Sequence, residues 1–166
     1  MAIISLNSCI GISKVYKYQG KKNLVVYTKT DSNVQAYLDI YKLKGKCGKY
    51  LEGRVKLNNG NTHISLLNNQ KYYLHVDFSS LLLESGQIGV GNITLGSQIV
   101  TKPNHLYKIE ATYIDDMYDV LFFKKALRGN SMKEINLKPL NKCPKNSSKP
   151  FVEINWFSHT SKEVLE

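Results

Sequence analysis

The chain has 166 residues, of which 42% are hydrophobic and 22% charged, so it is typical of one globular domain rather than a collagen-like, coiled-coil or disordered chain. Lys and Arg number 23 against 13 Asp and Glu, and the net charge of +10 favours acidic partners or anionic surfaces over basic ones. No segment reaches the roughly 18 consecutive apolar residues of a membrane-spanning helix, so we expect no such helix.

The first nine residues are apolar and end at a cysteine. Leu6-Asn7-Ser8-Cys9 resembles the lipobox of bacterial lipoproteins, in which a leucine and a small residue precede the cysteine that is lipidated. A secretory signal has a charged start and an apolar stretch of about 7–15 residues, whereas eight residues without Lys or Arg precede Cys9 here. We therefore expect Met1 to be an internal methionine of a longer natural signal. The alternative is an ordinary strand over residues 2–6 with a buried thiol at Cys9.

Period-two alternation predicts strands along most of the remaining chain. Val34, Ala36, Leu38 and Ile40 alternate with polar or aromatic residues, and residues 51–57 repeat the pattern. Asn58-Asn59-Gly60-Asn61 then predicts a hairpin turn, so residues 62–66 should return beside 51–57. A turn at 68–70 leads into a further antiparallel strand over 71–78.

The second half of the chain continues the strand pattern with one interruption. Residues 81–84 are too short to assign, and the glycines of 86–96 favour bulged edge strands or a mobile loop. Residues 106–114 and 119–124 alternate around Asp115-Asp116 and predict another hairpin, and a short strand is expected around 132–137. Residues 141–150 have the composition of a linker, and the polar residues 158–166 should be frayed.

These strands predict an all-β chain with little helix, folded as a single antiparallel β-sandwich of the immunoglobulin or transthyretin kind. Three parts follow: residues 1–9 as the remainder of a lipoprotein signal, 10–140 as the sandwich, and 141–166 as linker and tail.

The two remaining cysteines are predicted to form a disulfide. If Cys9 carries lipid, Cys47 and Cys143 remain as an even pair in an oxidising compartment, and each lies at a turn-like boundary. Closing this long loop would stabilise the fold by about 4.7 kcal/mol in the chain-entropy model. Two unrelated reduced thiols in a cytosolic protein are the alternative.

Residues that could carry chemistry are few. Gly86, Gly89 and Gly91 lack the spacing and the following helix of a phosphate-binding loop. In the predicted hairpin around Asn69, His63 lies opposite His75, which makes this pair a weak candidate for a metal site. Asp115, Asp116 and Asp119 suit a turn, with calcium as the alternative. We therefore predict no enzyme, no cofactor and no metal.

The chain resembles the small envelope lipoproteins of bacteria whose mature part is a β-sandwich with two cysteines. The resemblance depends on Leu6-Asn7-Ser8-Cys9, on the Cys47 and Cys143 pair and on the segment 103–109. It implies an outer-membrane or periplasmic protein, anchored through lipid on Cys9, with a structural or interaction role toward another envelope protein or an anionic surface. Ile10, where an aspartate would retain the protein, allows outer-membrane sorting.

Two alternatives remain open. Residues 34–43 resemble an early strand of the outer-membrane lipoprotein of type VI secretion systems, which is also a transthyretin-like sandwich. Basic residues interleaved with tyrosines, such as Lys14, Lys17 and Tyr18, would also suit a cytoplasmic β-domain that binds nucleic acid, although we do not favour it.

Overall fold

The computed structural model describes residues 14–45, 48–84, 87–140 and 157–159, and most of these residues lie in strands. The strands are β1 (Leu24–Thr30), β2 (Val34–Lys44), β3 (Gly48–Leu57), β4 (Gly60–Ile64), β5 (Lys71–Glu84), β6 (Gln87–Val100), β7 (His105–Ile114), β8 (Met117–Ala126), β9 (Lys133–Glu134) and β10 (Phe157–His159). Among these residues there is no helix, and hence none of a length and hydropathy that could cross a membrane.

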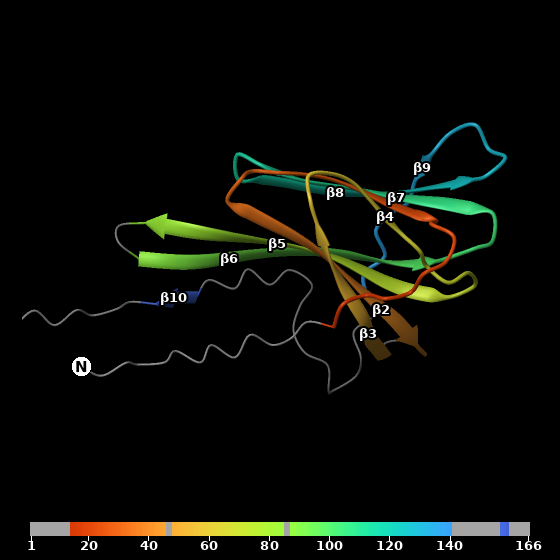
Figure 1. The fold of residues 1–166 in the computed structure, drawn as a ribbon, viewed down its shortest axis with the longest axis horizontal. Coiled ribbons are helices and arrows are strands. Elements are labelled where there is room, and N and C mark those ends of the chain that lie inside the picture. The colour runs from red at the N-terminus through yellow and green to blue at the C-terminus, as the bar shows by residue number, and fades with distance from the viewer. Residues whose placement is uncertain (1–13, 46–47, 85–86, 141–156, 160–166) are drawn as a thin grey trace, which may run out of the picture.

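The strands form two packed sheets, which confirms the predicted β-sandwich (Figure 1). The first sheet has the order β4-β1-β7-β8-β9 and the second the order β10-β6-β5-β2-β3. Their facing sides enclose one apolar core, whose most deeply buried large side chains include Leu24, Leu38, Ile40, Tyr72, Leu74, Phe78, Ile109 and Phe122.

The alternation read in the sequence places the core residues on the inner face of each strand. In β2, Val34, Ala36, Leu38 and Ile40 are all buried, while Gln35 and Tyr37 point outward. Because side chains alternate along a strand, a shift of one residue would move the whole inward row to the outer face. The fold would then lose about 25 cal/mol for each Å² of apolar surface exposed. The hydrophobic pattern therefore fixes the register of β2 against β3 and β5.

Strand β1 was not predicted, and it occupies a central position. Its residues Leu24 and Val26 are fully buried, and it pairs with β4 on one side and with β7 on the other. The β1–β7 pair is parallel, whereas the other strand pairs of the described residues are antiparallel. Parallel strands need a long connection, and here strands β2 to β6 supply it.

The predicted hairpin across Asn58–Asn61 is wrong. Gly60 does adopt a left-handed backbone, with φ of 102°, but β3 pairs with β2 and β4 pairs with β1 in the opposite sheet. Asn59 holds this crossover to the end of β1: its Oδ1 accepts a hydrogen bond from the Thr30 N–H at 2.7 Å, and its Nδ2 donates to the Thr30 carbonyl at 3.0 Å. The turn therefore joins the two sheets instead of closing a hairpin.

The interpretation of residues 86–96 as bulged edge strands or a mobile loop is also wrong for the described residues. Strand β6 runs without a break from Gln87 to Val100 and pairs with β5 along its whole length. Gly96 has a specific reason to be glycine: a Cβ at this position would collide with the Tyr73 hydroxyl. Gly96 thus lets the Tyr73 ring lie close against the strand.

Two later predictions are confirmed. Strands β7 and β8 form a hairpin whose turn residues, Asp115 and Asp116, have φ of 51° and 59°, as a type I′ turn requires. Asp115 also donates its backbone N–H to Asp31 Oδ2 at 2.9 Å. The expected short strand within 132–137 is β9, which pairs with β8 at two positions.

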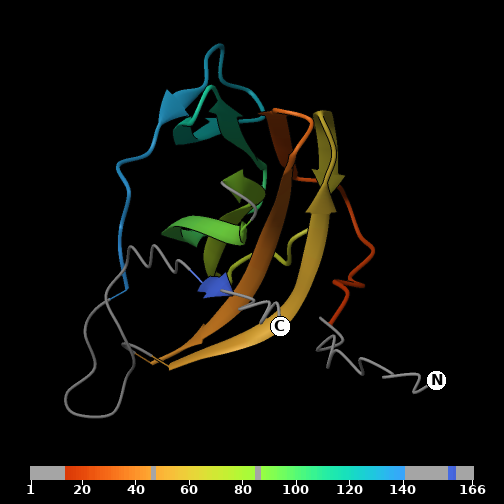
Figure 2. The same cartoon turned by 90° about the vertical axis from the view of Figure 1, so that its left-hand side faces the viewer.

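Irregular segments close both long sides of the sandwich, as Figure 2 shows for the segment before β1 and the segment after β9. On one side, Arg54 and residues 14–16 exchange backbone hydrogen bonds, and the Tyr16 hydroxyl donates to the Ser65 carbonyl at 2.8 Å. On the other side, Ile135 N–H donates to the Phe122 carbonyl of β8, and Gln98 N–H of β6 donates to the Lys138 carbonyl. We call residues 135–139 the strap.

Candidate functional site: a basic end with a lysine-lined cleft

The residues predicted to carry lipid and a disulfide lie outside the described part of the chain. This holds for Cys9, Cys47 and Cys143, and also for the linker over 141–150. Lipidation at Cys9 and the bridge between Cys47 and Cys143 therefore stay predictions.

The proposed pairing of His63 with His75 is wrong. His63 lies in β4 opposite Val25, whereas His75 lies in β5, between Asp39 and Gly96 of the other sheet. The reason is the crossover at Asn59, which sends β4 away from β5. In the described residues no group of three or more His, Cys, Asp or Glu side chains is arranged to hold a metal ion, and this includes Asp115, Asp116 and Asp119.

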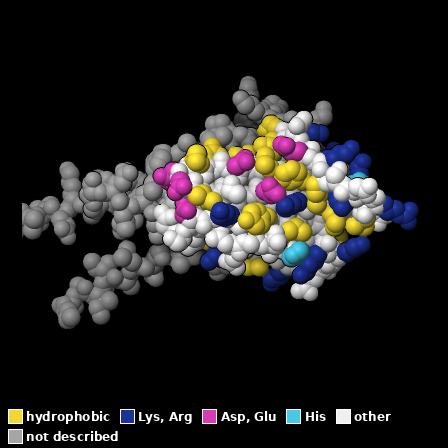
Figure 3. Space-filling model, turned by 90° about the horizontal axis from the view of Figure 1, so that it is seen from above, with side chains coloured by type: hydrophobic (Ala, Val, Ile, Leu, Met, Phe, Trp, Pro, Cys, Tyr) yellow, Lys and Arg dark blue, Asp and Glu magenta, His cyan; other side chains and the backbone are white. Residues whose placement is uncertain are grey.

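Charge is segregated between the two ends of the sandwich. The loops 67–70, 101–104 and 127–132 meet at one end: Thr101 N–H donates to the Gln70 carbonyl and Leu127 N–H to the Asn104 carbonyl. This basic end carries Lys21, Lys22, Lys71, Lys102, Lys124, Lys125 and Arg128. The turns at the other end carry Asp31, Asp115 and Asp116, with Asp119 close by in β8. Figure 3 shows Lys and Arg gathered toward one end of the face formed by the first sheet, and most Asp and Glu toward the other.

A cleft of about 290 Å³ opens at the basic end, between β6, β8 and the strap. Four lysines line it: Lys71, Lys102, Lys124 and Lys138. The other lining residues include Leu43, Ile99, Val100, Tyr107 and Ile135, so the walls between the lysines are mostly apolar. We call this the lysine cleft. None of the four lysines forms an ion pair with a described residue.

The floor of the lysine cleft is buried and hydrogen-bonded. Ile99 and Tyr107 are buried, with 5% and 4% of their surface exposed. The Tyr107 hydroxyl accepts a hydrogen bond from the Lys102 N–H at 2.9 Å and donates to the Val100 carbonyl at 3.1 Å. These bonds hold the loop after β6 against β7, so the backbone that carries Lys102 is fixed in position.

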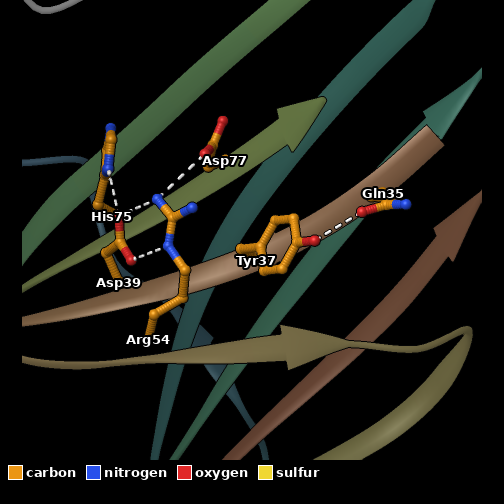
Figure 4. Close-up of polar contacts among 6 residues, drawn as sticks. All are labelled: Gln35, Tyr37, Asp39, Arg54, His75 and Asp77. Atoms are coloured by element: carbon orange, nitrogen blue, oxygen red, sulfur yellow. Dashed lines mark hydrogen bonds and ion pairs between the residues drawn. The ribbon is translucent and has the colours of Figure 1, made fainter. Parts of the chain in front are cut away.

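A second polar group lies on the outer face of the other sheet (Figure 4). Arg54 of β3 donates to both carboxylate oxygens of Asp39 in β2, from Nε at 2.6 Å and from Nη2 at 2.7 Å, and Nη2 also reaches Asp77 Oδ2 at 3.2 Å. His75 Nδ1 lies 3.8 Å from Asp39 Oδ2, which is within ion-pair range but too long for a hydrogen bond. We call Asp39, Arg54, His75 and Asp77 the ion cluster.

Neighbouring charges set the protonation of the two carboxylates. Burial disfavours the charged form of Asp39, but the hydrogen bonds from Arg54 and the proximity of His75 outweigh it and lower its pKa to about 2. Asp77 shares the same guanidinium at longer range, so burial prevails and its pKa is raised. The Asp39 carboxylate raises the pKa of Arg54 further above its ordinary value. Arg54 thus interacts with two carboxylates at once, those of Asp39 and Asp77.

Aromatic rings surround the ion cluster. Tyr73 stacks on His75 with ring centroids 5.8 Å apart, and Tyr41 lies 6.1 Å from Tyr73. Lys49 Nζ lies 4.7 Å from the centre of the Tyr41 ring, and the Arg54 guanidinium lies 5.1 Å from that of Tyr37. Asp39 is only 3% exposed beneath these groups, and the contacts of the ion cluster join strands β2, β3 and β5.

Sequence reasoning missed both features, for different reasons. Asp39, Arg54 and His75 come from three strands, and only the register of β2 against β3 and β5 brings them together. The lysines of the cleft come from both sheets and from the strap. The net charge of +10 and the basic residues interleaved with tyrosines pointed toward a basic surface but gave no position for the cleft.

The comparisons with known proteins add no relative: no family model, curated protein or solved structure shows a significant match to this chain.

Proposed function

We propose that this chain is a non-catalytic binding domain of the cell envelope, anchored through lipid on Cys9, whose basic end binds an anionic membrane surface. The observation that carries the proposal is the segregation of charge between the two ends of the sandwich. A net charge of +10 spread evenly over the surface would not favour one end of the protein for contact with a membrane.

The segment that follows Cys9 supports the same arrangement. Lys14, Lys17, Lys21 and Lys22 are all exposed, and Lys21 and Lys22 belong to the basic end. A basic residue near an anionic bilayer contributes about 1 kcal/mol to binding, and one acyl chain together with a polybasic patch gives a stable anchor. Lipid and lysines would thus act on the same surface.

The lipid anchor is tested by the intact mass of the protein expressed from its native upstream region in a bacterial host. We expect a chain that begins at Cys9 and carries added acyl mass. Under denaturing, non-reducing conditions it should take up no alkylating reagent, because Cys47 and Cys143 would be bridged. A chain that begins at Met1 with three alkylated thiols would contradict the anchor and the bridge together, and the cytoplasmic nucleic-acid alternative would then come first.

The basic end is tested by flotation of the unlipidated full chain with vesicles. We expect binding to vesicles of equal phosphatidylglycerol and phosphatidylcholine, and little to phosphatidylcholine alone. Reversing Lys21 and Lys22 to Glu should weaken binding by about 30-fold or more, since each lysine contributes about 1 kcal/mol.

The matched control reverses Lys29 and Lys56, which are exposed and lie toward the acidic end. Equal losses in the two double variants would refute a directional basic end. Stronger binding to single-stranded DNA than to anionic vesicles, with a steep dependence on salt, would favour the nucleic-acid alternative.

A further inference from the structure

A second hollow lies beside the lysine cleft, along the same edge of the sandwich. This hollow has a volume of about 160 Å³ and lies between β6, β8 and the strap, with Leu95, Phe122 and Leu137 among its lining residues. Ile135 of the strap lines both spaces and therefore lies between them. We call the second space the apolar hollow.

The two spaces have opposite chemistry. The described residues that line the lysine cleft include four lysines and no carboxylate. Ammonium groups brought together without a counter-charge repel one another, and an anion bound among them would relieve that repulsion. The lysine cleft is therefore suited to an anionic group.

The apolar hollow is suited to a hydrocarbon chain, and the carboxylates beside it determine which way round an amphiphile binds. Its walls are formed largely by Leu95, Val120, Phe122, Ile135 and Leu137. The charged residues that line it are Asp119 and Glu134, and they would repel an anionic head group placed there. An elongated amphiphile would therefore bind with its head in the lysine cleft.

We infer that this edge binds a single-chain amphiphilic anion, with a carboxylate or phosphate head among Lys71, Lys102, Lys124 and Lys138 and an acyl chain that passes Ile135 into the apolar hollow. Ligand pockets in proteins measure roughly 300–1,000 Å³, so an apolar hollow of about 160 Å³ is too small for the two chains of a membrane lipid. The ligand is a free small molecule, so this site goes beyond the proposed membrane contact and does not require it.

The test is calorimetric titration of the full chain with probes kept below their micelle concentration. Dodecanoate and dodecyl phosphate supply the two head groups on one chain, dodecyltrimethylammonium supplies the same chain with a cationic head, and acetate and inorganic phosphate supply heads alone. We expect both anionic amphiphiles to bind, and the cationic amphiphile and the heads alone to bind at least about tenfold more weakly. Comparing the two anionic amphiphiles identifies the preferred head.

Two variants test the two parts of the site separately. Replacing Lys71 and Lys124 by Gln should weaken dodecanoate binding by about tenfold or more, because charge-assisted hydrogen bonds are lost. Ile135→Trp adds bulk between the two spaces and should remove the advantage of dodecanoate over acetate. The control variant replaces Lys29 and Lys56 by Gln and should bind dodecanoate as the natural chain does.

Several results would overturn the site. They are equal binding of dodecanoate and dodecyltrimethylammonium, or unchanged binding in the Lys71 and Lys124 variant, which changes only exposed side chains and should fold normally. Because no vesicle is present, this titration is separate from the flotation test. Loss of vesicle binding with retained dodecanoate binding would refute the membrane contact alone, and the converse would refute this site alone.

Discussion

Replacing Arg54 by Met is expected to destabilise the protein by about 3 kcal/mol, because it leaves the Asp39 carboxylate charged and buried without its partner. The Asp39 side chain is only 4% exposed, and both of its oxygens accept hydrogen bonds from Arg54. The Arg54 side chain is 30% exposed, which places the expected loss at the lower end of the range for buried pairs. Urea denaturation of the variant and the natural chain measures the difference.

A matched surface pair provides the control. Lys108 and Glu110 lie 2.6 Å apart in β7, but their side chains are 33% and 36% exposed. Lys108→Met should therefore cost less than about 1 kcal/mol. Adding Asp39→Asn to Arg54→Met should recover part of the loss, because the buried charge is then removed. If the Arg54 and Lys108 variants lose equal stability, the ion cluster has no special role in the fold.

The pair formed by Asp39 and Arg54 also predicts that the stability of the fold depends on pH in the acid range. The pKa of Asp39 falls from its ordinary value of 3.8 to about 2 in the folded protein, so ionised Asp39 stabilises the fold above about pH 4. This contribution, about 2 kcal/mol, is lost as the pH falls from about 4 to about 2. Asp77 acts in the opposite sense, because its raised pKa favours folding with a bound proton. Asp39→Asn should flatten the acid loss; an unchanged slope in that variant would contradict this account.

Replacing Phe78 by Ala is expected to cost about 3–5 kcal/mol, the range for removing a large aromatic side chain from a core. Phe78 is 1% exposed on the inner face of β5, and its ring centroid lies 5.6 Å from that of Tyr113 in β7 of the opposite sheet. Its removal therefore opens a cavity between the two sheets, which the surrounding strands can only partly fill.

Two further variants serve as comparisons for the loss of stability in Phe78→Ala. Phe78→Leu keeps most of the volume and should cost less than the alanine variant. Met117→Ala truncates an apolar side chain that is 74% exposed and should change stability by less than about 0.5 kcal/mol. Thermal or urea unfolding checks all three. A small loss in Phe78→Ala would mean that the sheets do not pack through this residue.

Local chemistry was enough to predict several elements. In β2 the alternation of Val34, Ala36, Leu38 and Ile40 with polar residues gave both the strand and its buried face, because a strand with one dry side has a period of two. Asp115-Asp116 between two alternating segments gave the β7–β8 hairpin, since short polar residues tolerate the left-handed backbone of a type I′ turn. From such elements followed the all-β sandwich.

Pairing between strands distant in sequence could not be predicted in the same way. Residues 58–61 carry a strong hairpin signal, yet Asn59 is hydrogen-bonded to Thr30 and β4 pairs with β1 in the other sheet. The predicted hairpin around Asn69, which placed His63 opposite His75, is wrong as well, because β4 and β5 lie in different sheets. A turn motif fixes local backbone angles, whereas the choice of sheet depends on which arrangement buries both Leu57 and Ile64.

The sequence by itself determined the all-β class, the inward row of the regular strands and the excess of positive charge, because composition and period act locally. The tertiary structure alone decided where that charge lies and which side chains meet. It gathered Lys71, Lys102, Lys124 and Lys138 around one cleft, and it joined Asp39 to Arg54 across neighbouring strands. The physical reason is that a cleft and a buried ion pair are properties of packed strands, and their members have no fixed spacing along the chain.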